Sequence, residues 1–105
     1  MKLDVSLLIL NAGLLSRGEL INTKPGEIQA LMDVNMYHPT AMLKKFVPGL
    51  LNRSSENRRK KQSGLIVVSS SLATSATPAS CTYSASKAYL EYLCFGLERE
   101  ISVAG

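Results

Sequence analysis

Two short runs of apolar residues set the pattern of hydrophobic and polar positions in this chain. The first extends from Val5 to Leu10 and ends at Asn11-Ala12-Gly13; the second extends from Leu65 to Val68 and is followed by three serines. Apolar runs without polar alternation are typical of strands buried on both faces, as in parallel sheets covered by helices. We therefore predict two buried parallel strands, each with small or polar residues at its carboxyl end.

Between the two runs, apolar residues recur at the spacing of an amphipathic helix. Thr23 is the predicted N-cap, and Pro25 falls in the first turn, where its missing N–H does no harm. Because parallel strands joined by a helix form a right-handed βαβ unit, the pattern predicts such a unit here. The apolar positions of this helix are Ile28, Leu31, Met32, Pro39, Met42, Leu43, Phe46, Val47 and Leu50.

Two residues within this helix depart from the apolar pattern. Asn35 is polar on the apolar face, and Pro39, four residues later, has no N–H to donate to the carbonyl of Asn35. We predict a kink at this place and a carbonyl left free. The helix alone leaves two interpretations open: a purely structural kink with a satisfied asparagine, or a carbonyl that has a function.

A last helix is predicted from about Tyr83 to Val103, with apolar residues on two sides. One side should cover the sheet, and the other should meet a neighbouring helix or a second subunit. The first stripe contains Lys87, Leu90, Leu93, Leu97 and Ile101, and the second contains Ala85, Tyr89, Tyr92 and Phe95.

The remaining segments are predicted as loops. Residues 14–22 and 72–82 are mixed or rich in small residues, whereas residues 52–63 are polar throughout and should form an exposed, mobile basic loop. Much of the net charge of +4 comes from Arg58–Lys61 within that loop. Since no aromatic residues are interleaved with these charges, we interpret them as a solvated charge run and expect no nucleic-acid partner. Binding that weakens steeply with salt would favour the opposite interpretation.

Length and composition limit the class of protein further. A chain of 105 residues with 46% hydrophobic content suits one small globular domain. Two cysteines without a CxxC pair and a single histidine cannot assemble a zinc site, so we expect no metal. Reduced cysteines favour an intracellular protein, cytoplasmic by default. Asp4 and Ser6 interrupt the apolar N-terminus, and no stretch approaches the roughly 20 apolar residues of a membrane span.

The candidate chemistry lies in the segment from Leu65 to Lys87. Tyr83 and Lys87 are four residues apart, so on a helix they share one face and bring a phenol next to an ammonium. The serines leave the carboxyl end of a strand, which is where open α/β sheets build their ligand sites. Tyr-x-x-x-Lys is a weak pattern alone, but it gains weight from the strand, serine cluster and helix start around it.

Together, Leu10–Gly13, Asn35, residues 66–70 and Tyr83-Ser84-Ala85-Ser86-Lys87 resemble a classical short-chain dehydrogenase/reductase. The resemblance covers nearly the whole chain apart from the basic loop. It implies an α/β fold with a partial Rossmann-like, doubly wound parallel sheet, which is a three-layer αβα arrangement in complete members of the family. Residues 1–105 would be the central part of an NAD(P)-binding domain, from its fourth strand to the helix after its fifth.

The resemblance also implies roles for individual residues. The family's catalytic Asn, Ser, Tyr and Lys would correspond to Asn35, Ser70, Tyr83 and Lys87, with Ser69 and Ser71 as alternatives to Ser70. The implied reaction is hydride transfer between a nicotinamide and a carbonyl or alcohol carbon, with Tyr83 as general acid or base. A lysine ammonium next to a tyrosine favours its phenolate form.

By the same resemblance, Lys87 would also hold the nicotinamide ribose and Ser70 would bind the substrate oxygen. The turn formed by Asn11, Ala12 and Gly13 would lie near the cofactor together with Tyr83 and Lys87. The carbonyl of Asn35 could hold a water that relays protons between Lys87 and solvent, and the position of Pro39 gives this role a physical basis.

The chain departs from the family in lacking the glycine-rich turn, TGxxxGxG, that places the cofactor pyrophosphate at a helix N-terminus. We therefore expect a fragment of an NAD- or NADP-dependent oxidoreductase that is inactive in isolation. The alternative is a non-catalytic remnant that at most pairs through its last two helices with a full-length relative.

The helix sequence from Tyr83 to Glu100 most resembles hydroxysteroid dehydrogenases and 3-oxoacyl-CoA reductases. This resemblance implies a steroid or fatty-acyl carbonyl or alcohol as substrate. A homo-oligomer through the last two helices stays open, because the second apolar side of the last helix could meet a second subunit. An endoplasmic reticulum membrane location of a longer parent protein stays open, because an anchor would lie outside this chain.

Overall fold

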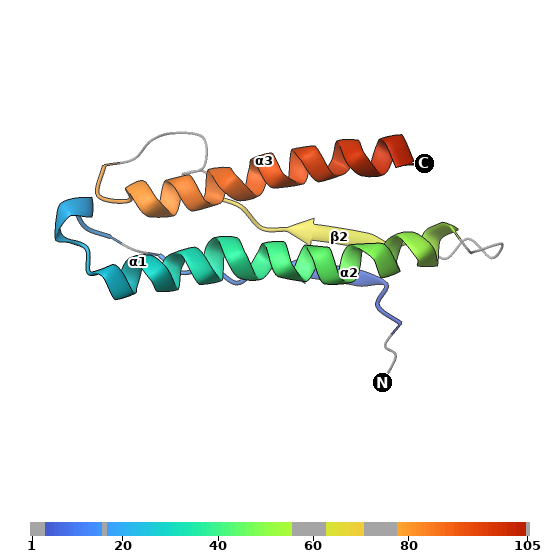
Figure 1. Cartoon of the computed structure of the whole chain (residues 1–105), viewed down its shortest axis with the longest axis horizontal. Coiled ribbons are helices and arrows are strands. Elements are labelled where there is room, and N and C mark those ends of the chain that lie inside the picture. The colour runs from blue at the N-terminus through green and yellow to red at the C-terminus, as the bar shows by residue number, and fades with distance from the viewer. Residues whose placement is uncertain (1–3, 16, 56–62, 71–77, 105) are drawn as a thin grey trace.

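The computed structural model describes residues 4–15, 17–55, 63–70 and 78–104 of the chain. Its elements follow one another as strand, long interrupted helix, strand and helix (Figure 1). In order they are β1 (Leu7–Leu10), a 3₁₀ turn (Leu20–Asn22), α1 (Pro25–Met32), a π-helical turn (Asp33–Tyr37), α2 (His38–Ser55), β2 (Gly64–Val67) and α3 (Cys81–Ala104).

The two strands pair in parallel, as the βαβ pattern predicted. The register places Leu7 opposite Gly64 and Leu10 opposite Val67. The Val68 N–H extends the ladder by donating to the carbonyl oxygen of Leu10 at 2.9 Å. Because the strands run in the same direction, the turn after β1 and the serines after β2 leave the same edge of the sheet.

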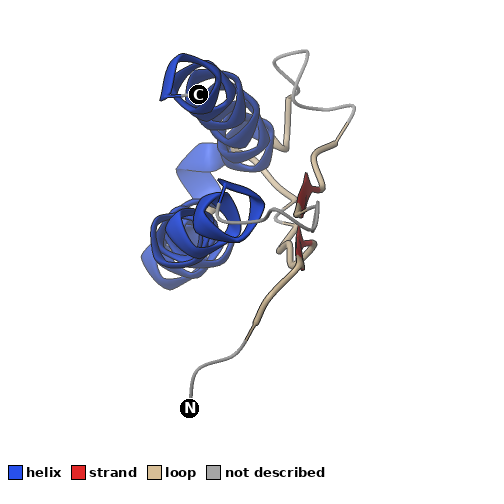
Figure 2. Cartoon of the chain, turned by 90° about the vertical axis from the view of Figure 1, so that its right-hand side faces the viewer, coloured by secondary structure: helices blue, strands red, loops and turns tan. Residues whose placement is uncertain are grey.

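Both helical segments lie on the same side of the two strands (Figure 2). Successive side chains of a strand point to opposite faces, so Leu8 is buried under the helices while Leu7, Ile9 and Ile66 are half-exposed on the other face. The prediction of strands buried on both faces is therefore wrong for this chain. Within the described residues, nothing covers the second apolar face.

The long helix contains the irregularity that Asn35 and Pro39 predicted. At the π-helical turn the N–H of His38 donates to the carbonyl of Asp33, five residues earlier instead of four. This shift by one residue lets the helix pass Pro39, which has no N–H, and continue as α2. Whether the carbonyl of Asn35 is free stays a prediction.

The start of α1 corrects one detail of the sequence interpretation. Lys24, not Thr23, occupies the N-cap position, and its side chain makes no capping hydrogen bond. The Thr23 hydroxyl instead donates to the carbonyl of Glu19 at 2.9 Å. Pro25 is the first helical residue, as its position predicted.

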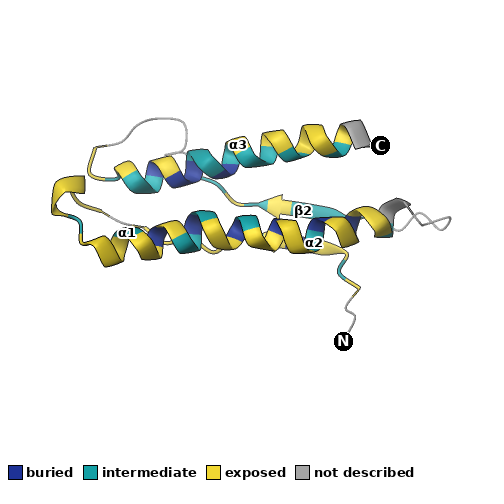
Figure 3. Ribbon diagram, viewed as in Figure 1, coloured by how far each residue is buried: buried dark blue, intermediate teal, exposed yellow. Residues whose placement is uncertain are grey.

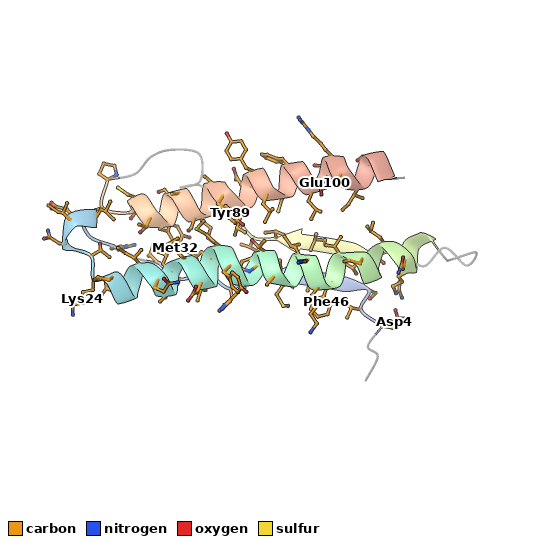
Figure 4. All side chains as sticks on the ribbon, viewed as in Figure 1. Asp4, Lys24, Met32, Phe46, Tyr89 and Glu100 are labelled. Carbon is orange, nitrogen blue, oxygen red and sulfur yellow. The ribbon has the colours of Figure 1, made fainter. Side chains whose placement is uncertain are left out.

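The core lies between the long helix, α3 and the covered face of the sheet (Figure 3). On α3, Lys87 and Leu90 of the first stripe are buried, and the rest of that stripe, Leu93, Leu97 and Ile101, is half-buried. On its second stripe, Tyr89, which is labelled in Figure 4, shares a 2.7 Å hydrogen bond with Thr40 of α2, whereas Tyr92 and Phe95 are exposed. The buried apolar residues are Leu8, Leu31, Leu43, Val47, Leu50 and Leu90.

Two predicted loops are shorter than the sequence indicated. Because α2 extends to Ser55, residues 52–55 of the expected basic loop are helical, and because α3 begins at Cys81, residues 81–82 belong to a helix as well. Arg58–Lys61 lie outside the described residues. No helix in the described part of the chain combines the length and the apolar character needed to cross a membrane.

Both cysteines are free thiols. Cys81 is exposed at the start of α3, and burial raises the pKa of the Cys94 thiol further along the same helix.

Candidate active site

The residues selected from the sequence come from four segments that converge at one edge of the sheet. Asn11–Gly13 follow β1, and Ser69 and Ser70 follow β2. Tyr83 and Lys87 lie in the first two turns of α3, and Asn35 lies in the π-helical turn. Gly13, Asn35 and Lys87, which are far apart in the sequence, lie next to one another in space.

Lys87 is buried although it carries a charge. Its side chain is 3% exposed, and its ammonium lies against the turn after β1. A Cβ atom at Gly13 would lie 3.2 Å from Lys87 Nζ, 3.8 Å from Lys87 Cε and 3.9 Å from Asn35 Oδ1. Gly13 therefore provides the space in which the ammonium sits, because a larger residue would press on it.

Tyr83 and Lys87 share one face of α3, as their spacing predicted. The Lys87 ammonium lies 5.9 Å from the centre of the Tyr83 ring. Within the described residues this ammonium has no hydrogen-bond partner.

Asn35 is fully buried, and its side-chain amide is satisfied by the protein itself. Its Oδ1 accepts the N–H of Leu14 at 2.8 Å, and its Nδ2 donates to the carbonyl of Leu14 at 2.9 Å. The Nδ2 group also donates to Ser86 Oγ at 3.1 Å. For the side chain, the structural interpretation is therefore correct: the amide holds the loop after β1 against the π-helical turn.

The serines after β2 have different surroundings. Ser69 Oγ donates to Glu91 Oε1 of α3 at 3.2 Å, so its hydroxyl is engaged with a carboxylate. Ser70 follows at the same edge and is half-buried, while Ser71, the other alternative, lies outside the described residues.

Three residues that hold this arrangement were missed in the sequence analysis. Leu14 takes part through its backbone, for which no sequence signal exists. Glu91 and Ser86 have one: each is polar on the turns of α3 that also carry Lys87 and Leu90, where an apolar residue would be expected. A polar residue on a buried helix face needs a partner, and this requirement could have identified both.

The chain matches a family model and resembles curated proteins of the same kind. A model described as short chain dehydrogenase matches residues 2–105. Over 83 residues the chain is 35% identical to dehydrogenase/reductase SDR family member 7B of Xenopus tropicalis, covering 79% of this chain and 25% of that protein. The chain therefore spans about a quarter of the length of the curated relatives it matches.

Solved structures agree with this fold. A metagenomic short-chain oxidoreductase in complex with NADP is 28% identical with a TM-score of 0.80, and the alignment covers 92% of this chain and 41% of that one. A 3-ketoacyl-(acyl-carrier-protein) reductase from Brucella melitensis complexed with NADH is 22% identical with a TM-score of 0.85, covering 96% and 41%. At that identity the second likeness shows the fold alone. The predicted α/β, partial Rossmann-like fold is confirmed.

The contact between Gly13 and Lys87 leads to a first prediction. In Gly13→Ala the new methyl group should displace the ammonium, because 3.2 Å is too close for a relaxed contact. We expect Lys87 to become more reactive toward an amine-acylating reagent, measured by peptide mass spectrometry under native conditions.

Gly96→Ala is the matched control, since a Cβ there meets nothing within 4 Å. This substitution should leave the labelling of Lys87 unchanged and stabilise α3 by about 0.5–1 kcal/mol. Equal labelling of Lys87 in both variants would contradict the proposed role of Gly13.

Proposed function

The chain belongs to the short-chain dehydrogenase family, and from this premise we propose that it supplies the acid–base part of an NAD(P)-dependent oxidoreductase site. The reaction is hydride transfer between a nicotinamide and a carbonyl or alcohol carbon. The observation that carries the proposal is the buried residue Lys87, whose ammonium lies against Gly13 on the same helix face as Tyr83.

Tyr83 is the proposed general acid and base. In reduction its phenol donates a proton to the carbonyl oxygen as the carbon receives the hydride, and in oxidation its phenolate accepts the proton of the alcohol. The nicotinamide cofactor, when bound, gives or takes the hydride. The Lys87 ammonium lies 5.9 Å from the centre of the Tyr83 ring, which places a positive charge beside this residue.

Lys87 has a second proposed role as a hydrogen-bond donor to the cofactor ribose. Its ammonium lacks an acceptor among the described residues, and a ribose hydroxyl or a water would satisfy it. Asn11, Ala12 and Gly13 would line the cofactor beside it. We propose Ser70 as the donor to the substrate oxygen.

The carbonyl of Asn35 is proposed to hold a water of the proton relay. Pro39 supports this role because it has no N–H to give to that carbonyl. The side chain of Asn35 does not take part directly, since its amide is occupied by Leu14 and Ser86.

The cofactor, the substrate and the cellular compartment are proposed as broad classes. Among the similar structures one holds NADP, and an NADH-dependent reductase that is 27% identical holds NAD, so either nucleotide fits the proposal. A small carbonyl or alcohol is the proposed substrate class, with steroids and fatty-acyl compounds as its narrower members. Two free thiols favour an intracellular compartment.

Tyr83→Phe tests the reaction. In the intact protein that carries this chain, we expect turnover to fall by about 10²- to 10⁴-fold, because the phenolic proton is lost while the ring remains. Cofactor affinity, measured by calorimetry, should change little. Tyr92→Phe removes the hydroxyl of a tyrosine that is 76% exposed on the same helix and should leave turnover unchanged. Full turnover in Tyr83→Phe would remove this residue from the mechanism.

A second prediction concerns the 105-residue chain alone. It contains no glycine-rich turn to hold the cofactor pyrophosphate, so we expect no measurable binding of NAD(H) or NADP(H) by calorimetry. Saturable binding at micromolar concentrations would overturn this expectation and support a self-sufficient site. An intact protein that binds cofactor but shows no turnover with any carbonyl substrate would favour the non-catalytic alternative.

Pairing with a second copy through α2 and α3 is a further proposal. It is supported by Tyr92 and Phe95, which form an exposed edge-to-face pair with ring centres 6.3 Å apart on α3. If this face pairs, Tyr92→Ser combined with Phe95→Ser should shift the intact protein toward monomer in sedimentation equilibrium. Tyr37→Ser, on an exposed tyrosine of the π-helical turn, is the control. An unchanged mass for the double variant would argue against this surface.

A further inference from the structure

Ser86 is a fully buried serine between the two residues that the proposed reaction uses most. It lies on α3 directly before Lys87 and three residues after Tyr83, and its exposed fraction is 0%. Its hydroxyl donates to the carbonyl oxygen of Tyr83 at 2.7 Å and accepts Asn35 Nδ2 at 3.1 Å. The proposed chemistry leaves this hydroxyl without a role.

Each of these hydrogen bonds has one permitted direction. The Tyr83 carbonyl can only accept, so the single proton of the Ser86 hydroxyl goes there, and Ser86 must accept from Asn35. The amide of Asn35 is thereby fixed in one orientation. Nδ2 faces the two acceptors, Ser86 Oγ and the Leu14 carbonyl, and Oδ1 faces the Leu14 N–H.

The result is one continuous chain of hydrogen bonds across three segments. It begins at Leu14 in the loop after β1, passes through Asn35 in the π-helical turn and Ser86 on α3, and ends at the backbone of Tyr83. Every N–H and O–H of the Asn35 and Ser86 side chains donates to an acceptor in this network. Buried polar networks of this kind are rigid when every donor has its partner.

We infer that Ser86 is a positioning residue for the proposed reaction. Its hydroxyl fixes the first turns of α3, and with them Tyr83 and Lys87, onto the π-helical turn and the loop that contains Gly13. Ser86 acts through the backbone of Tyr83 and through Asn35; within the described residues its hydroxyl makes no hydrogen bond to the phenol or the ammonium. The inference rests on the proposed function for its effect on turnover, but the hydrogen-bond chain can be tested independently.

Removing this hydroxyl should have a specific consequence. Without it, one N–H of the buried Asn35 amide loses its acceptor, so the amide must move or admit water. Its two bonds to Leu14 should then weaken. A shift of α3 by a fraction of an ångström is enough to lower turnover, because proton transfer depends on the placement of the phenol.

Ser84 offers a matched control two residues away. It is the same residue type on the same helix and is 5% exposed, but its hydroxyl has no hydrogen-bond partner in the described part of the chain. Ser84→Ala therefore removes a buried hydroxyl without breaking a bond, whereas Ser86→Ala breaks two.

The experiment compares Ser86→Ala, Ser86→Cys and Ser84→Ala in the intact protein. The rate of native-state hydrogen exchange at the Leu14 amide measures how firmly the hydrogen-bond chain holds, and kcat and KM measure the reaction. For both Ser86 variants we expect about tenfold faster exchange at Leu14 and about tenfold lower kcat, with KM for cofactor changed less than about threefold. Ser84→Ala should leave the exchange rate at Leu14, kcat and KM for cofactor close to their values in the unaltered protein. Cysteine fills the space of the serine, so an effect in both variants cannot come from a cavity.

The outcomes separate this inference from the proposed function. If Ser86→Cys keeps normal exchange at Leu14 and normal kcat, the hydroxyl does not position the site and the inference is wrong. The same holds if Ser86→Ala behaves like Ser84→Ala while Tyr83→Phe is inactive. If instead Tyr83→Phe is fully active, the proposed reaction fails, and the exchange at Leu14 alone decides whether Ser86 holds the three segments together.

Discussion

The buried amide of Asn35 is the interaction on which the rest of the site depends. Its three hydrogen bonds join the loop after β1, the long helix and α3. Apolar contacts tolerate sliding, whereas a fully buried amide with all its partners in place accepts one arrangement. The loop that carries Gly13 and the helix that carries Lys87 are therefore held in a fixed relation.

The π-helical turn explains why Asn35 can make these bonds. Ahead of Pro39 the helix changes from bonds over four residues to bonds over five, which rotates the side chains that follow relative to those before. Such turns are rare, and they occur mostly as single turns inside α-helices, often at functional sites. Here the turn places a polar side chain against α3, and α2 continues beyond it with Leu43, Val47 and Leu50 in the core.

Within the described residues, the two-stranded sheet has one covered face and one open face. Helices cover one face of two strands, and Leu7, Ile9 and Ile66 are half-exposed on the other. Parallel sheets are stable when both faces are covered, and short-chain dehydrogenases of known structure extend well beyond the matched region.

The sequence by itself determined the features that depend on local chemistry. Two apolar runs predicted the parallel strands, the spacing of Tyr83 and Lys87 predicted a shared helix face, and Asn35 with Pro39 predicted an interrupted helix. Where local signals were ambiguous, as at Thr23 and at Ser55, the predicted boundaries were wrong by a few residues.

The tertiary structure alone decided which distant groups meet. Asn35 bonds to Leu14 across 21 residues and to Ser86 across 51, and Gly13 makes room for the Lys87 ammonium. It also decided that both helices cover the same face of the sheet. These contacts depend on how whole elements pack, and a backbone carbonyl or a missing Cβ leaves no mark in a hydrophobic pattern.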